Sequence, residues 1–185
     1  MVFTKNTGQW PDSILFRAAG SGIVTWFTRR AMYFQLPHVS AHAREALTRK
    51  SRLSSPGPRV SGESSGIETK FIKTTLVGCN PSVTIETGDI VDYKCNFFLG
   101  NDPTRWRTAV PNYSAITYKS VYPGVDLRFT DKNGELAATF CSKSSAALDQ
   151  VSIRCEGSDS VLINRLNRMF AAKGLSGAAG ASELS

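Results

Sequence analysis

The sequence predicts an all-β fold, built as an antiparallel β-sandwich or a partly open barrel. Many short segments alternate apolar and polar positions and are rich in β-branched and aromatic residues, which is typical of half-buried strands. Gly, Pro, Asn and Asp separate these segments at short intervals. No long stretch of helical periodicity lies between them, which favours antiparallel neighbours over helical crossovers.

The N-terminal region, residues 3–36, is predicted to be an opening loop followed by a meander of short strands. The two glycines of Gly20-Ser21-Gly22 are expected to supply positive φ at a tight connection. The expected strands are 14–18, 23–28 and 31–36.

Residues 37–66 are rich in Ser, Pro, Gly and Arg, with too few apolar side chains to offset the entropy of ordering them. We therefore predict a flexible, disordered insertion there. His38 and His42 have the spacing of a two-histidine metal site on a helix. No Cys, Asp or third His lies nearby, so no metal site is predicted.

Order is predicted to resume near residue 67 and to continue to residue 163. Asn133-Gly134 is the preferred pair for a type I′ hairpin. Val125, Leu127 and Phe129 are therefore expected to face Leu136, Ala138 and Phe140 across it. The other turn residues are Gly100, Asn101, Asp102, Pro103, Pro123 and Gly124. The expected strands are 69–77, 83–87, 93–99, 115–118, 125–130, 135–141 and 151–155.

These elements are interpreted as a single domain spanning residues 3–163, interrupted by the insertion at 37–66. The tail at 164–185 is rich in Ala, Gly and Ser and is predicted to be disordered or weakly helical.

Two blocks, residues 3–36 and about 67–163, carry a set of motifs in a fixed order. The motifs include Gly8-Gln9-Trp10, Trp26-Phe27-Thr28, Asn96-Phe97-Phe98, Gly100-Asn101-Asp102-Pro103, Trp106-Arg107-Thr108 and Tyr122-Pro123-Gly124-Val125-Asp126-Leu127. In these the chain resembles the N-terminal β-rich domain found ahead of SBBP-type β-propeller repeats in secreted bacterial proteins, a family of unknown function.

The resemblance implies a non-enzymatic module at the cell surface or outside the cell, with a role in assembly or adhesion and a cell-envelope glycan or protein as partner. Met1 to Phe3 enter the motif directly, so no signal peptide is expected within this chain. Three explanations are compatible with this: the true start lies upstream, the signal peptide was removed, or this protein stays inside the cell. After residue 163 the family's Gly-centred hairpin is missing, and the expectation is a truncated, frame-disturbed or decaying copy.

The net charge of +7 has no single location in the sequence, so we interpret it as solvated surface charge. The alternative is binding of anions or nucleic acid through the basic segment 44–59, although the scattered charge argues against a nucleic-acid partner. No apolar stretch is long enough to span a membrane.

Cys79, Cys95, Cys141 and Cys155 form no CxxC pair, which argues against zinc. Because Cys141 and Cys155 fall in strand-like apolar patterns, buried free thiols are predicted in preference to disulfides.

The best candidate for a ligand-facing cluster is Trp106 between Arg105 and Arg107, with Tyr113 and Tyr118 beyond them. Exposed aromatic rings stack on sugars, and arginine supplies planar donors, so a carbohydrate-binding module is the second functional hypothesis. The competing interpretation places Trp106 at one end of the sandwich as a core residue, under the arginine stems.

Asp126 is predicted to anchor a loop, with calcium binding as the weaker alternative because hard cations need six or more oxygens. The sequence shows no converging nucleophile, base or carboxylate pair, so no catalytic residue and no cofactor is predicted.

Overall fold

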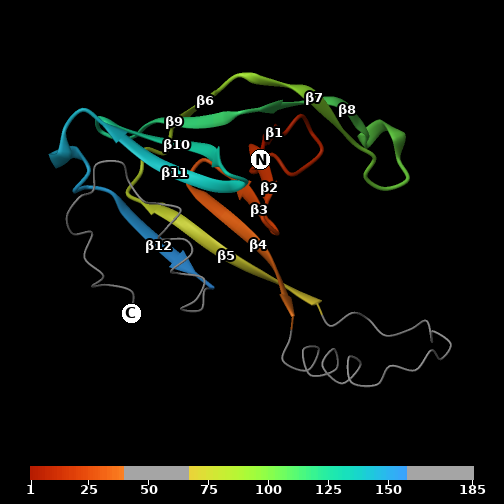
Figure 1. The fold of residues 1–185 in the computed structure, drawn as a ribbon, viewed down its shortest axis with the longest axis horizontal. Helices are drawn as coiled ribbons and strands as arrows, with labels where there is room; N and C mark the ends of the chain where they lie inside the picture. The colour runs from red at the N-terminus through yellow and green to blue at the C-terminus, as the bar shows by residue number, and fades with distance from the viewer. Residues whose placement is uncertain (40–66, 158–185) are drawn as a thin grey trace.

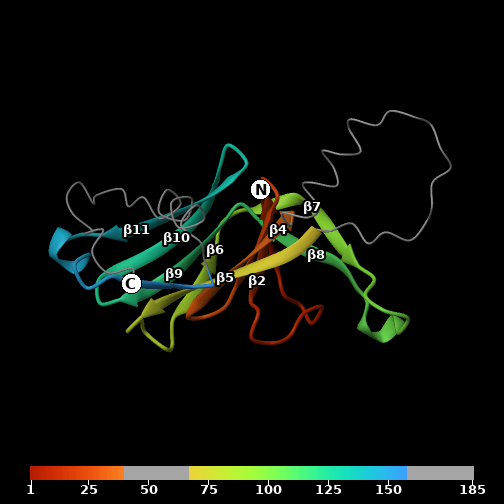
Figure 2. The same ribbon diagram turned by 90° about the horizontal axis from the view of Figure 1, so that it is seen from below.

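The computed structural model describes residues 1–39 and 67–157. Within these residues the chain forms two antiparallel sheets that pack around one core, with two short 3-10 turns and no α-helix (Figures 1 and 2). The sheets do not close into a barrel, so the predicted all-β class is confirmed with an open architecture. The strands are β1 (Phe3–Lys5), β2 (Phe16–Gly20), β3 (Ile23–Phe27), β4 (Ala31–Val39), β5 (Ile67–Val77), β6 (Thr84–Thr87), β7 (Ile90–Phe97), β8 (Arg107–Tyr113), β9 (Ala115–Tyr122), β10 (Val125–Lys132), β11 (Glu135–Ser142) and β12 (Ser152–Glu156).

The large sheet has eight strands in the order β12-β5-β4-β3-β2-β1-β8-β7. The small sheet has four strands in the order β11-β10-β9-β6. The chain therefore leaves the large sheet after β5, enters the small one for β6, and returns for β7 and β8. At the far end β12 comes back to pair with β5. The two edge strands of the large sheet, β12 and β7, are therefore distant from each other in the sequence (Figure 1).

The core lies between the two sheets and is dominated by aromatic rings. Phe27 of β3 meets Phe129 of β10 with ring centroids 5.0 Å apart, and Tyr118 of β9 contacts the same ring at 5.7 Å. All three are fully buried. The Tyr118 hydroxyl donates to the Thr28 carbonyl at 2.7 Å, which satisfies the only polar atom of that side chain. The two sheets are joined by this contact as well as by apolar packing.

The β10–β11 hairpin has the predicted register. Leu127 is opposite Phe140 and Phe129 is opposite Ala138, and all four are buried. The connecting residues Asn133 and Gly134 have φ of 56° and 81°, which is the left-handed conformation that a type I′ turn needs at both positions. A local sequence signal was sufficient here because the turn and both strands lie within 18 residues, 125–142.

Two strands were not predicted. The expected opening loop begins with β1, which pairs with β2 and with β8. The segment that forms β8 was assigned to the ligand-facing cluster and not to a strand. In the structure Pro111 lies where the pairing of β7 and β8 shifts register between Val91 and Cys95, so its missing N–H costs no regular ladder bond.

The predicted insertion boundary at residue 37 is wrong by three residues. β4 continues through Pro37 to Val39, and these residues pair with the start of β5. Pro37 is tolerated because the pairing with β3 ends near Gln35, so the strand has one neighbour at that point. The remaining insertion, 40–66, and the tail, 158–185, lie outside the described residues, as does the histidine pair prediction at His42.

Candidate functional site

β7 and β8 form an arm that extends to one side of the fold (Figure 1). Trp106 lies in the connection between them, after the 3-10 turn Pro103–Arg105 and directly before β8. Its ring packs edge-on against Phe98 with centroids 5.2 Å apart, and its indole N–H donates to the Gly100 carbonyl at 3.2 Å. The side chain is 38% exposed. Trp106 therefore closes the turn between β7 and β8, away from the core between the sheets.

Arg107 is held by backbone carbonyls. Its guanidinium donates to the carbonyls of Thr7 at 3.0 Å, Thr104 at 2.9 Å and Trp106 at 2.9 Å. It thus ties the arm to the loop between β1 and β2. A side chain with three such bonds is committed to structure, since moving it toward a ligand would leave those carbonyls to water.

Tyr113 lies at the other end of β8. Its ring packs against Phe16 beside the core, with centroids 6.3 Å apart. Seven residues of extended chain separate it from Trp106, which is about 23 Å. Tyr118 is fully buried in the core between the sheets. The structure therefore does not bring the predicted cluster together. The side chain of Arg105 lies outside the described part of the chain.

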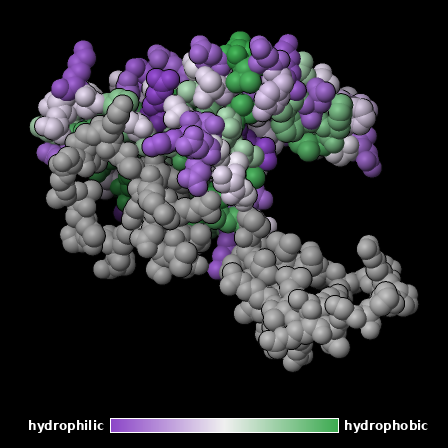
Figure 3. All heavy atoms as spheres, in the orientation of Figure 1, coloured by the Kyte–Doolittle hydropathy of each residue, from purple (hydrophilic) through white to green (hydrophobic). Residues whose placement is uncertain are grey.

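The arm carries several exposed apolar and aromatic side chains. Figure 3 shows some green, hydrophobic surface over β7 and β8. β7 is an edge strand of the large sheet. Its register shifts interrupt the regular ladder, a feature that protects edges from pairing with other chains. The exposed side chains are Ile90, Tyr93, Phe98, Leu99 and Trp106.

Two of the predicted turn aspartates bind backbone N–H groups. Asp102 caps the 3-10 turn Pro103–Arg105 by accepting from the Thr104 N–H at 2.9 Å. Asp126 accepts from the Ser120 N–H at 2.7 Å and from the Lys119 ammonium. This places Asp126 in the loop-anchoring role that the sequence interpretation preferred. Ser120 has φ of 51°, so the contact fixes a residue in a costly backbone conformation.

The pKa of Asp126 is below its ordinary value. Partial burial raises this pKa, but hydrogen bonds from Lys119 and the Ser120 N–H together outweigh burial. A depressed folded-state pKa stabilises the fold at pH values above the unfolded pKa, about 3.9. That contribution is lost as the pH falls through the folded-state pKa.

Asp126→Asn is expected to lower the free energy of unfolding by about 0.5–1 kcal/mol at neutral pH, because the amide cannot pair with Lys119. As pH falls below about 4, the difference between variant and wild type should shrink toward zero. Urea unfolding at a series of acid pH values measures both effects. An undiminished difference at the lowest pH would contradict the assigned role of the carboxylate.

All four cysteines lie within the described residues and all are free. Only Cys79 is buried, and burial raises the pKa of its thiol. Cys141 is exposed, so the prediction of a buried thiol is wrong there. The reason is the alternation along β11, where Phe140 takes the inward position and Cys141 the outward one.

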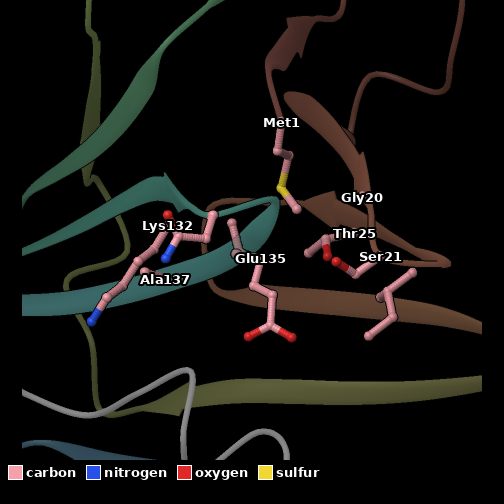
Figure 4. A pocket seen from close by; sticks show the side chains of 10 residues that line it. Met1, Gly20, Ser21, Thr25, Lys132, Glu135 and Ala137 are labelled. Carbon is pink, nitrogen blue, oxygen red and sulfur yellow. The ribbon is translucent and has the colours of Figure 1, made fainter.

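A pocket of about 670 Å³ opens between the β2–β3 and β10–β11 hairpins (Figure 4). The Ser21 hydroxyl donates to the Gly134 carbonyl at 2.9 Å and joins the two hairpins. Gly20 is required by close approach, since a Cβ there would lie 2.8 Å from the Gly134 carbonyl oxygen. Lys132 and Glu135 supply the charges of the wall. The pocket is thus a gap between two turns, lined by both polar and apolar residues.

The sequence interpretation missed the outer face of the large sheet, the side opposite the core. Thr25 and Phe27 of β3 point inward, so Trp26 points outward. Consecutive cross-strand pairs place Trp26 in a row that runs across five strands. We call this the outer row: Arg17, Trp26, Tyr33, Lys73 and Glu156.

Trp26 is half-buried on the outer face and does not lie in the core between the sheets. Trp10 packs edge-on against it, with centroids 5.3 Å apart, and the Arg17 guanidinium lies over its ring at 5.4 Å. The indole N–H donates to Gln35 Oε1 at 3.0 Å. Burial lowers the pKa of Arg17, but the guanidinium remains a cation at neutral pH. These contacts hold the ring and the charge in fixed positions.

The loop between β1 and β2 carries Trp10 onto this face. The Asn6 side-chain amide donates to the carbonyls of Trp10 at 3.0 Å and Ile14 at 2.7 Å, and Gln9 donates to the Lys5 carbonyl at 2.7 Å. These side-chain hydrogen bonds hold the loop in place, as backbone hydrogen bonds between strands do in a sheet. The signal that could have located the site is the apolar character of both faces of β3, which one buried face does not require.

Among residues 1–39 and 67–157, no helix is long and apolar enough to cross a membrane. In the same part of the chain, no group of three or more His, Cys, Asp or Glu side chains is arranged to hold a metal ion.

Residues 3–175 match the family described as Domain of unknown function (DUF7948). No curated protein matches the chain at a significant level. No solved structure matches it at a significant level either. The family match covers both blocks of motifs, the insertion between them and part of the tail. Because it spans most of the 185 residues, the chain belongs to the DUF7948 family of domains.

Proposed function

We propose that this domain is a non-enzymatic recognition module of a secreted or cell-surface protein, and that it acts in assembly or adhesion through the outer face of its large sheet. The observation that carries the proposal is the outer row. It places aromatic rings, held by their neighbours, beside fixed charges on the broadest surface of the fold. Surfaces of this composition recognise partners, because aromatics and arginine dominate binding energy at interfaces.

The arrangement of the two sheets supports this assignment. Inward-facing side chains of the large sheet, including Phe3, Phe27 and Phe34, form part of the core. The outer face has no second sheet over it in the described residues (Figure 2). Phe71 on this face is 54% exposed. A partner that covers this side chain would remove its apolar surface from water, which is favourable.

The location outside the cell rests on the resemblance to domains that precede propeller repeats in secreted proteins. An envelope partner follows from that location. The carbohydrate site predicted at Trp106 stays a prediction, and it relies on a single half-exposed ring, since Arg107 and Tyr113 are engaged elsewhere. The proposed anion site at 44–59 lies outside the described residues.

The test is retention of the fluorescently labelled 185-residue chain on isolated bacterial cell envelopes. We expect wild type to be retained and the double variant Tyr33→Ala, Phe71→Ala to be retained at about a tenth of that level, because both rings lie on the outer face. Trp106→Ala removes an aromatic ring from the arm and is the matched control. It should be retained as wild type is.

Retention that is lost in Trp106→Ala and kept in the double variant would move the site to the arm. No retention of wild type would overturn the envelope role. Thermal unfolding of each variant must accompany the binding data, so that loss of fold is not read as loss of contact.

A further inference from the structure

The outer row combines aromatic rings with charge in a fixed order across the strands. Arg17 and Trp26 lie on β2 and β3, Tyr33 on β4, and Lys73 on β5. Lys73 pairs with Glu156 on β12 at 3.0 Å. Gln35 and Phe71 form the next cross-strand pair along the sheet. The surface is therefore a flat aromatic strip with a cation toward each end.

The rings suit the apolar faces of sugars. Trp26 is fixed by Arg17 and Gln35, so little rotamer entropy is lost when a ligand stacks nearby. Tyr33 lies directly opposite Trp26 on the neighbouring strand, and Phe71 is diagonal to Tyr33. Three aromatic side chains at these separations form a platform wider than one sugar ring. An elongated ligand is the better fit.

The charge of the face selects an anion. Arg154 lies beside Lys73 and lowers its pKa, while Glu156 raises that pKa more strongly through a hydrogen bond. Three cations, Arg17, Lys73 and Arg154, thus share the face with the carboxylate of Glu156. The chain as a whole carries a net charge of +7, so long-range electrostatics also attract an anionic ligand.

The spacing of the charges selects a polymer with intermittent acid groups. Three strand spacings of about 4.8 Å separate Arg17 from Lys73, which is about 14 Å. A single monosaccharide cannot reach both cations, whereas a chain of several rings can. Nucleic acid carries a charge at every nucleotide and needs a denser row of cations for tight binding.

We propose that the outer row binds an acidic polysaccharide, whose sugar rings pack on Tyr33 and Phe71 beside Trp26 and whose carboxylates pair with Arg17, Lys73 and Arg154. This ligand class rests on the proposed function of the same face and names its partner. Lys73 exchanges part of its contact with Glu156 for the ligand carboxylate. Arg17 keeps its stacking contact with Trp26 and turns its outward N–H groups to the ligand.

Polygalacturonate is the probe, and uncharged dextran is its control. We expect tryptophan fluorescence of the 185-residue chain to saturate with polygalacturonate at low salt, with at least about tenfold weaker binding of dextran. Added salt should weaken the polygalacturonate complex, because carboxylate pairing at an open face is screened. A single-stranded DNA oligonucleotide is the third probe.

Matched variants distinguish binding at the outer row from non-specific attraction by the positive charge of the chain. Tyr33→Ala should weaken polygalacturonate binding about tenfold, and Phe98→Ala on the arm should not. Arg154→Gln should weaken it about threefold, while Arg128→Gln on the small sheet leaves it unchanged. Arg128 is exposed on the small sheet, away from the outer row. Its substitution therefore removes the same charge as Arg154→Gln without changing the outer row.

Equal binding of dextran and polygalacturonate overturns the acidic class, and so does tighter binding of the DNA. Equal effects of Arg154→Gln and Arg128→Gln overturn the assigned cations. Envelope retention that depends on Tyr33 and Phe71 without any polygalacturonate binding overturns this inference alone. Loss of both signals in wild type removes the proposed function as well.

Discussion

Phe129→Ala is expected to lower the free energy of unfolding by about 3–5 kcal/mol, the largest effect of any single change considered for this domain. Phe129 is fully buried at the centre of the core. Its ring contacts Phe27 of the large sheet and Tyr118 of its own sheet. Truncation removes apolar burial and leaves a cavity between two rigid sheets that cannot close around it.

Urea unfolding followed by far-ultraviolet circular dichroism measures this change, with Phe98→Ala as the matched control. Phe98 is the same residue type, but it is 59% exposed on the arm. The control should cost less than about 1 kcal/mol. Similar losses for both variants would contradict the placement of the core between β3 and β10.

Asn112→Ala is expected to lower the free energy of unfolding by about 2–4 kcal/mol. Asn112 is a fully buried polar residue of β8. Its Oδ1 accepts from the Thr4 hydroxyl at 2.6 Å, and its amide donates to the Tyr93 carbonyl at 3.0 Å. Alanine leaves a buried hydroxyl and a carbonyl without those partners, which costs more than the bonds themselves contribute.

Asn96→Ala is the appropriate comparison for this variant. Asn96 lies on the neighbouring strand and accepts from the Ala109 N–H at 2.9 Å, but it is exposed, so water can replace the lost bond. We expect a loss of about 0.5–1 kcal/mol. The variant Thr4→Val combined with Asn112→Ala should lose less than the two separate losses added together, because the two side chains share one bond. Strict additivity would show that the Thr4 contact contributes nothing.

Much of the fold was predictable because its signals are local. The β10–β11 hairpin depends on Asn133-Gly134 and on alternation within the flanking strands, and both operate over a few residues. β8 was not predictable in the same way. It contains Pro111 and a register shift, and it becomes a strand only because β1 lies on one side and β7 on the other.

The candidate site shows the same difference between features with local sequence signals and features that depend on distant strands. The sequence interpretation found aromatic and basic residues at 105–107 and combined them with Tyr113 because they are close in the chain. In the structure Trp106 and Tyr113 occupy opposite ends of one strand, and Arg107 binds backbone carbonyls. The outer row could not be predicted from the sequence, because its members come from five strands and each strand contributes one residue.

The sequence by itself determined the all-β class, most of the strands and the hairpin register, because alternation and turn residues act through nearest neighbours. Only the tertiary structure decided which face of the large sheet would be covered. Alternation gives β3 two apolar faces, with Phe27 on one and Trp26 on the other. The small sheet packs on the Phe27 side, and the contact between Phe27 and Phe129 is made by residues a hundred positions apart. Long-range packing of this kind cannot be read from either strand alone, and it leaves Trp26 on the open face.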